Sequence, residues 1–157
     1  MRLHFICRAG LTALFLTVAS AGLAATDVVG SAAVADGRTL TVAGQSFQLL
    51  GIAVPAPGAL CQRQDRPFDC GKVATSQLAD LTVGATVRCV PVGNADAGHR
   101  LARCSVDGYD LSGGMVYTGW ARADRNQTDR FDGTEAEARR AGRGLWAKGI
   151  KRPLDWQ

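Results

Sequence analysis

The sequence has few of the residues on which nucleophilic catalysis depends. It contains two histidines, and only His99 lies beyond residue 24. No serine stands in a G-x-S-x-G motif, the turn that presents the nucleophile of many hydrolases. The cysteines beyond residue 24 are even in number, which favours disulfides over a free catalytic thiol. A hydrolase built on a serine or cysteine nucleophile is therefore not expected.

Long apolar runs are also scarce, and the clearest one lies near the start of the chain. Residues 9–24 are apolar apart from small polar breaks, and they follow Arg2 and Arg8. This run is short for a membrane anchor, which is the alternative. Gly22 and Ala24 supply the small residues of a signal-peptidase site, and no lipoprotein cysteine follows. We expect residues 1–24 to be a signal peptide, and residues 25–157 to be one exported domain, periplasmic or secreted, without a transmembrane segment.

The charge of the chain gives little support for a nucleic-acid partner. Removal of the leading segment would lower the formal net charge from +4 to +2. Residues 122–152 hold nine basic and five acidic side chains, so one face there could be basic. Mixed charge of this kind is more typical of a solvated helix face than of a binding surface.

Four cysteines remain beyond residue 24, and their spacing favours two disulfides. Residues 85–92 and 99–106 have the pattern of a hairpin, with Cys89 and Cys104 nearly symmetric about its tip. These two residues are expected to pair, which leaves Cys61 and Cys70 to close a short loop. A zinc site of four thiolates is the alternative, but no C-x₂-C pair is present, and export favours disulfides.

The remaining pattern predicts strands first and helices later. Strands are expected over residues 28–34, 38–42 and 46–52, and a helix over 70–82, where apolar residues recur at helical spacing. Asp110 is a candidate N-cap for a short helix, and Thr134 with Glu137 forms a capping-box pattern for a helix over 134–142. With the hairpin, this order describes an α+β domain with a small five-stranded barrel and about three helices.

Five motifs in order, the first of them in two parts, resemble the staphylococcal-nuclease-like (thermonuclease) family over nearly all of residues 25–157. The family's D-G-D-T and R-L-x-G-I-D-A-P-E patterns are similar to residues 36–39 and 48–56. Residues 70–74, 103–111, 115–121 and 135–146 resemble its C-G-x-x-A, R-C-x-x-x-G-x-D-L, M-V-x-x-G-W-A and E-x-x-A-R-x-x-x-R-G-L-W segments. The resemblance implies an OB-fold barrel of the staphylococcal nuclease type. The large apolar residues in these motifs are expected to be core: Trp120, Trp146, Leu145 and Met115.

The same resemblance implies a catalytic site whose chemical groups are replaced here. The family binds calcium between two aspartates, activates water with a glutamate and holds the phosphate with two arginines. In this chain Arg38 and Ala53 stand at the positions of the two metal-binding aspartates. Ala56 stands at the position of the glutamate base, and Gln48 and His99 stand at those of the two arginines. An arginine repels a cation and an alanine offers no oxygen, so no metal cofactor is expected.

Two neighbouring residues leave alternatives open. Arg100 follows His99 and is expected to face away from the site because side chains alternate along a strand, although a bulge would turn it inward. Asp36 is expected to be a turn residue in Asp-Gly, with a stray metal ligand as the alternative.

These replacements favour an inactive nuclease-family protein that acts by binding or as an envelope accessory. A link to exopolysaccharide (succinoglycan) biosynthesis comes from family association only. A residual or redirected phosphodiesterase is the second hypothesis. The partner is unknown, and weak binding of an anion, a nucleic acid or an acidic polysaccharide through Arg38, His99 or Arg100 is a further hypothesis.

Overall fold

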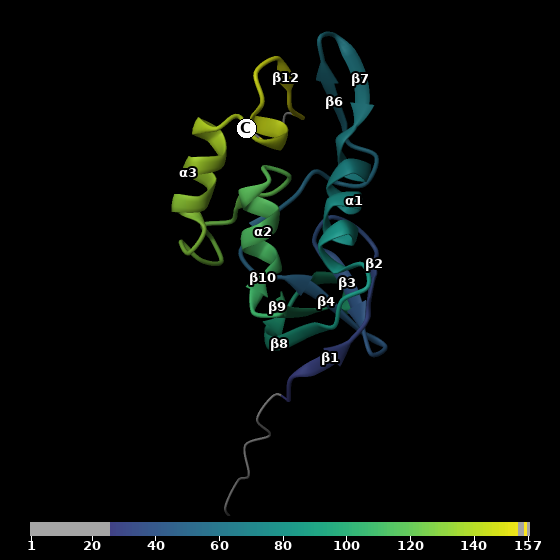
Figure 1. Ribbon diagram of the computed structural model, residues 1–157. Coiled ribbons are helices and arrows are strands. Elements are labelled where there is room, and N and C mark those ends of the chain that lie inside the picture. The colour runs from purple at the N-terminus through teal and green to yellow at the C-terminus, as the bar shows by residue number, and fades with distance from the viewer. Residues whose placement is uncertain (1–25, 154–155, 157) are drawn as a thin grey trace, which may run out of the picture.

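The computed structural model describes residues 26–153 and 156, so the expected signal peptide over residues 1–24 lies outside the described part. A curled sheet forms the base of the molecule, two of the helices lie over it, and a third lies beside one of these (Figure 1). The strand order along the sheet is β1-β8-β9-β4-β3-β2, with β10 paired to β9. The strands are β1 (Val28–Gly30), β2 (Ala32–Val34), β3 (Thr39–Val42), β4 (Gln45–Leu49), β8 (Val87–Asn94), β9 (Arg100–Val106) and β10 (Tyr109–Asp110).

The order of these strands makes the sheet a barrel. β1 and β2 are the two ends of the order, although only Ser31 separates them in the chain. A sheet whose end strands are joined by one residue must curl until its two edges approach each other. The expected first strand over 28–34 is therefore broken at Ser31, where one half pairs with β8 and the other with β3. The α+β fold with an OB-type barrel is confirmed.

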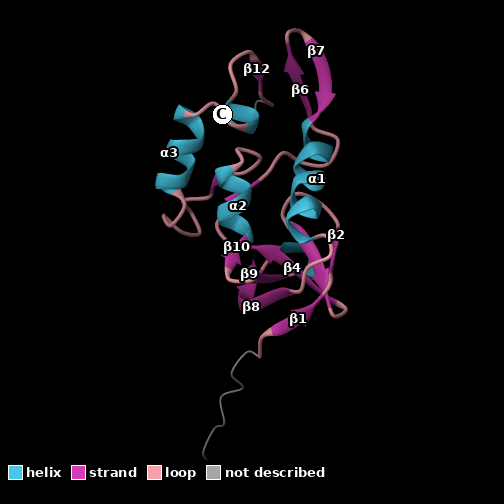
Figure 2. Cartoon of the chain, viewed as in Figure 1, coloured by secondary structure: helices cyan, strands magenta, loops and turns pink. Residues whose placement is uncertain are grey.

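Helices α1 (Cys70–Thr82) and α2 (Leu111–Tyr117) lie side by side above the sheet (Figure 2). Each begins at an aspartate N-cap. The Lys72 N–H donates to Asp69 Oδ1 at 2.8 Å, and the Gly113 N–H donates to Asp110 Oδ1 at 2.9 Å. Such caps satisfy backbone donors that the first helical turn leaves free. The short helix η1 (Asp96–Gly98) lies at the tip of the β8–β9 hairpin.

Helix α3 (Asp132–Arg140) shows that the capping-box prediction was wrong. The helix begins two residues before Thr134, and its N-cap Phe131 makes no side-chain capping bond. Phe131 is buried against the barrel core and Glu135 is 2% exposed, so tertiary packing fixes the start of the helix. The Glu135 carboxylate accepts from the Ala123 N–H at 2.6 Å, which ties α3 to strand β11 (Arg122–Ala123).

A second small sheet projects beyond α1 and was not predicted (Figure 1). It consists of β6 (Leu60–Arg63), β7 (Arg66–Asp69) and β12 (Ile150–Lys151). Gln64 and Asp65 join β6 to β7, both with positive φ, as a two-residue hairpin turn requires. The Lys151 ammonium pairs with the Asp65 carboxylate and lowers its pKa.

The described residues form two hydrophobic clusters. The larger one fills the barrel and extends to α1, α2 and Phe131. The smaller one lies between the β6–β7 hairpin and the C-terminal segment, which contains the short helix η2 (Gly144–Trp146). Its buried members are Cys61, Cys70, Leu145 and Trp156. Trp120 packs against both clusters, and Met115 and Leu145 are fully buried, as the sequence predicted.

The predicted disulfide pairing is the one in the structure. Cys89 and Cys104 are cross-strand partners in β8 and β9 and are bonded to each other. Cys61 is bonded to Cys70 at the start of α1. Among residues 26–153, the longest helix has 13 residues, and none is long and apolar enough to cross a bilayer.

Candidate functional site

A pocket of about 270 Å³ opens between the turn before β3, residues 53–57, strand β11 and Trp156. It is lined by Asp36, Arg38, Ala53, Val54, Ala56, Pro57, Arg122 and Trp156. Three of these residues, Arg38, Ala53 and Ala56, are positions that the sequence matched to the two metal ligands and the base of a nuclease. The structure therefore gathers them in one place, although Arg38 is distant in sequence from Ala53 and Ala56.

Arg38 is held by a turn that Asp36 organises. Asp36 Oδ1 accepts from the backbone N–H groups of Arg38 and Thr39, at 2.8 and 2.9 Å. The Leu49 N–H donates to the Arg38 carbonyl at 2.8 Å, which fixes this turn to the end of β4. Asp36 thus has the turn role expected from the Asp-Gly sequence.

Ala53 lies opposite an arginine that the sequence did not point to. Strand β5 (Ile52–Ala53) pairs with β11, and Arg122 is the direct cross-strand partner of Ala53. Directly opposed residues of an antiparallel pair have their side chains on the same face. Ala53, which the resemblance matches to a metal-binding acid of the family, therefore has its methyl group on the same face of this strand pair as the Arg122 side chain.

Ala56 belongs to a loop that presses closely on the start of α1. A Cβ added at Gly71 would overlap the Ala56 carbonyl group, so only glycine lets the helix approach this loop. The Ala59 N–H donates to the same carbonyl at 2.9 Å. The loop is fixed from two sides, but the Ala56 side chain has no group that could accept a proton from water.

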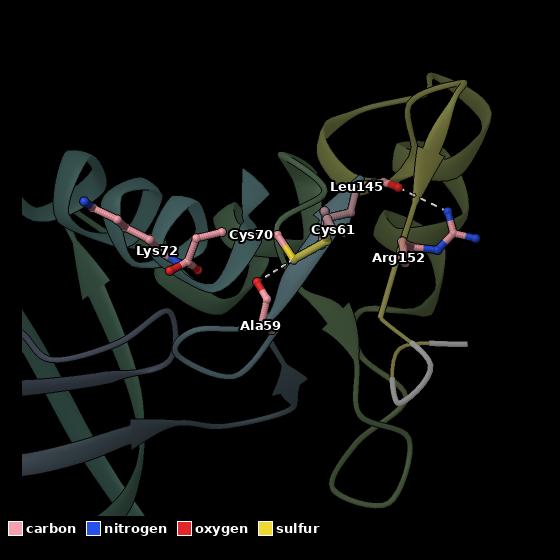
Figure 3. Close-up of a disulfide and its surroundings, with 7 residues drawn as sticks. Ala59, Cys61, Cys70, Lys72, Leu145 and Arg152 are labelled. Atoms are coloured by element: carbon pink, nitrogen blue, oxygen red, sulfur yellow. Dashed lines mark hydrogen bonds between the residues drawn. A yellow bond between two sulfur atoms is a disulfide. The ribbon is translucent and has the colours of Figure 1, made fainter. Parts of the chain in front are cut away.

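Trp156 forms the last wall of the pocket and belongs to the second cluster. It is 2% exposed, and its ring lies 5.1 Å from that of Trp146. Figure 3 shows the Cys61–Cys70 disulfide between Ala59 and the C-terminal segment, where Arg152 Nη1 donates to the Leu145 carbonyl at 3.1 Å. The disulfide thus supports the surroundings of Trp156.

The other candidate site residues do not line this pocket. His99 precedes β9, and its Nδ1 lies 2.7 Å from Ser46 Oγ in a hydrogen bond. Arg100 donates from Nη1 to Gln45 Oε1 at 2.8 Å, and its guanidinium carbon lies 5.9 Å from the centroid of the Phe47 ring. Gln48 pairs with Thr39 in β3. Neither His99 nor Arg100 adds a cation to the two arginines that line the pocket.

The lining of the pocket does not fit a calcium ion. Calcium requires six to eight oxygen ligands, with carboxylates supplying most of the charge. Asp36 is the one carboxylate among the lining residues, and its Oδ1 accepts two backbone hydrogen bonds. The guanidinium groups of Arg38 and Arg122 oppose a cation there. Across residues 26–153 and 156, no group of three or more His, Cys, Asp or Glu side chains is placed to hold a metal.

Two pocket residues, Arg122 and Trp156, were not anticipated from the sequence. Arg122 directly follows the G-W-A motif. Its place in the pocket depends on the pairing of β11 with β5, which the sequence did not predict. Trp156 lies near the end of the chain, beyond the last motif that resembles the family. Both depend on contacts between distant segments, which local patterns do not encode.

Comparisons with known proteins agree with this architecture. The family model described as staphylococcal nuclease homologue matches residues 46–148. The chain is 31% identical over 128 residues to the succinoglycan biosynthesis protein ExoI of Rhizobium meliloti (strain 1021). That match covers 78% of this chain and 66% of the length of the relative. With its curled OB-type barrel, its three helices and this match over most of its length, the chain belongs to the staphylococcal nuclease family.

Proposed function

We propose that this protein is an exported member of the nuclease family that has lost catalysis and acts by binding, as an accessory of envelope polysaccharide biosynthesis. One observation carries the proposal. The pocket that contains the positions matched to the family's metal ligands and base has two guanidinium groups, two alanines and a single carboxylate engaged in a turn. Base, metal ligands and clamping arginines act together in such a site, so their joint replacement leaves little catalysis.

Support for the accessory role comes from the named relative and from the disulfides. The relative is called a succinoglycan biosynthesis protein, and extending its role to this chain is part of the proposal. Two disulfides are typical of proteins that fold outside the reducing cytoplasm. We propose accordingly that residues 1–24 are a signal peptide and that residues 25–157 act in the periplasm or outside the cell.

The protein is expected to show no calcium-dependent nuclease activity. Purified protein would be incubated with single-stranded DNA and calcium, beside a comparator that restores the family pattern through Arg38→Asp, Gln48→Arg, Ala53→Asp, Ala56→Glu and His99→Arg. Cleavage by the unmodified protein that disappears with EDTA would contradict the proposal. Retention of that cleavage in Asp36→Ala would further show that a site other than this pocket carries it.

Export can be tested separately from activity. When the full chain is expressed in a Gram-negative host, the exported form is expected to begin at residue 25 and to contain no free thiol. N-terminal sequencing and intact mass of the periplasmic fraction would measure both. Recovery of uncleaved chain in the cytoplasm, with four reactive thiols beyond residue 24, would contradict the assigned location.

A further inference from the structure

We propose that the pocket binds the oxyanion group of an acidic saccharide directly, without a metal ion, between the side chains of Arg38 and Arg122. This inference rests on the proposed function, because it assigns a ligand to the pocket in which the family's catalytic groups are proposed to be replaced. The oxyanion is a carboxylate, sulfate or phosphate attached to a sugar.

Charge is the first observation in its favour. The two guanidinium groups and the Asp36 carboxylate leave the pocket lining with a formal charge of about +1 at neutral pH. Among the described residues, Arg38 and Arg122 are two of several arginines without an ion pair, and they are the two that line this pocket. Unpaired guanidinium groups at the wall of one pocket are suited to a carboxylate or phosphate, because their planar forks match its oxygens.

Unsatisfied donors are the second observation. Arg122 Nε and Trp156 Nε1 are buried and have no hydrogen-bond partner among the described residues. Buried donors are normally paired, and an unpaired one is costly. Both belong to residues that line the pocket, so its walls contain two donors without a partner among the described residues. An oxyanion has several lone pairs and accepts from more than one donor at once.

Space for the anion comes from the replacement at Ala53. The methyl group of Ala53 lies directly across from Arg122, so no acid neutralises the guanidinium from the opposing strand. The volume of about 270 Å³ is just under the range of roughly 300–1,000 Å³ that holds drug-sized ligands. A pocket of this size suits one charged group and part of the sugar ring that carries it.

The lining also favours a saccharide over single-stranded nucleic acid. Proteins that bind single strands offer exposed aromatic faces on which bases stack. The one aromatic side chain of this pocket, Trp156, is 2% exposed and packed into the second cluster. The exposed tyrosines Tyr109 and Tyr117 line a different groove, so the pocket has no stacking platform.

Calorimetric titration in the presence of EDTA tests the proposal with a short oligoglucuronate as probe. Its neutral oligoglucose analogue, inorganic phosphate, inorganic sulfate and an oligothymidylate are the comparison ligands. We expect the oligoglucuronate to bind more tightly than each of these, unaffected by EDTA and more weakly as salt rises. Arg38→Ala and Arg122→Ala should each weaken binding about tenfold or more, since each removes a charged hydrogen-bond donor.

Two further variants sharpen the test. Ala53→Asp places a carboxylate across from Arg122 and should also weaken binding about tenfold, without removing either arginine. Arg140→Ala removes the same charge from the exposed surface of α3 and should leave the affinity unchanged. Circular dichroism of each variant confirms that the fold is retained.

Equal affinity of wild type, Arg38→Ala and Arg122→Ala, or no binding at all, would overturn the proposal. Binding of inorganic phosphate or sulfate as tight as that of the saccharide would overturn the assignment of a sugar ligand. Tighter binding of the oligothymidylate would overturn it in favour of nucleic acid. Nuclease activity would refute the proposed loss of catalysis but would not change the measured affinities. Failure of the proposed function and failure of this inference are therefore distinguishable.

Discussion

Gly119→Ala is expected to lower the free energy of unfolding by about 2–5 kcal/mol. Gly119 follows α2 with φ near +78°, a conformation that costs residues with a Cβ about 1–2 kcal/mol. A Cβ at this position would also overlap the carbonyl oxygen of Arg143. That oxygen belongs to the backbone of the segment leading into η2, so the clash adds about 1–3 kcal/mol of overpacking.

Gly84→Ala is the matched control. Gly84 also has positive φ, near +70°, but no atom lies within 4 Å of where its Cβ would be. The control should therefore cost only about 1–2 kcal/mol, from backbone strain alone. Urea denaturation followed by circular dichroism measures both changes. Equal losses for the two variants would show that the contact between the α2 end and the Arg143 segment is loose.

Removal of the Cys89–Cys104 disulfide is the second change with a large expected effect. The double variant Cys89→Ala and Cys104→Ala should lose about 3–5 kcal/mol of stability. The bond closes a loop of 15 residues in sequence separation, and both cysteines lie in the barrel core with at most 1% exposure. The loss therefore combines a freer unfolded chain with weaker packing between β8 and β9.

The corresponding change at Cys61 and Cys70 should behave differently. Their bond closes a separation of 9 residues in the second cluster, so the loss of stability should be smaller, about 2–3 kcal/mol. Thermal unfolding of both double variants under non-reducing conditions gives the comparison. A larger loss at Cys61 and Cys70 than at Cys89 and Cys104 would contradict the expectation that the longer loop and the barrel core make Cys89–Cys104 the more stabilising bond.

Much of the fold could be predicted because local signals agreed with it. The symmetric placement of Cys89 and Cys104 about a turn-rich tip fixed the hairpin register, and helical spacing of apolar residues fixed α1. The β6–β7 hairpin was missed, because Pro67 lies in a strand and the turn residues Gln64 and Asp65 are not glycine. Pro is uncommon within strands except at edges, so the segment has the local pattern of a loop.

The candidate site could be predicted only in part. The sequence matched Arg38, Ala53 and Ala56 to catalytic positions of a family pattern, and the structure places these three residues around one pocket. Arg122 could not be found this way because its role depends on the register between β11 and β5. The expected start of α3 at Thr134 failed for a related reason, since the burial of Phe131 determines where that helix begins.

Gly119 and Gly144 belong to separate motifs, but one close backbone contact requires glycine at both positions. A Cβ at Gly144 would lie 2.6 Å from the carbonyl oxygens of Thr118 and Gly119, and Gly119 in turn closely approaches Arg143. The Leu145 N–H donates to the Gly119 carbonyl at 3.0 Å. The G-W-A and R-G-L-W motifs are therefore the two sides of one backbone contact, which joins α2 to η2.

The division into two hydrophobic clusters determines what intrinsic fluorescence can report. The chain has three tryptophans. Trp146 and Trp156 lie in the second cluster, and Trp120 packs at its boundary with the barrel core. Emission therefore records the state of the disulfide-linked C-terminal region and of the pocket wall at Trp156, whereas the interior of the barrel contributes no indole of its own. Far-ultraviolet dichroism, which follows strands and helices, is the complementary probe, and any difference between the two unfolding curves measures how independently the clusters melt.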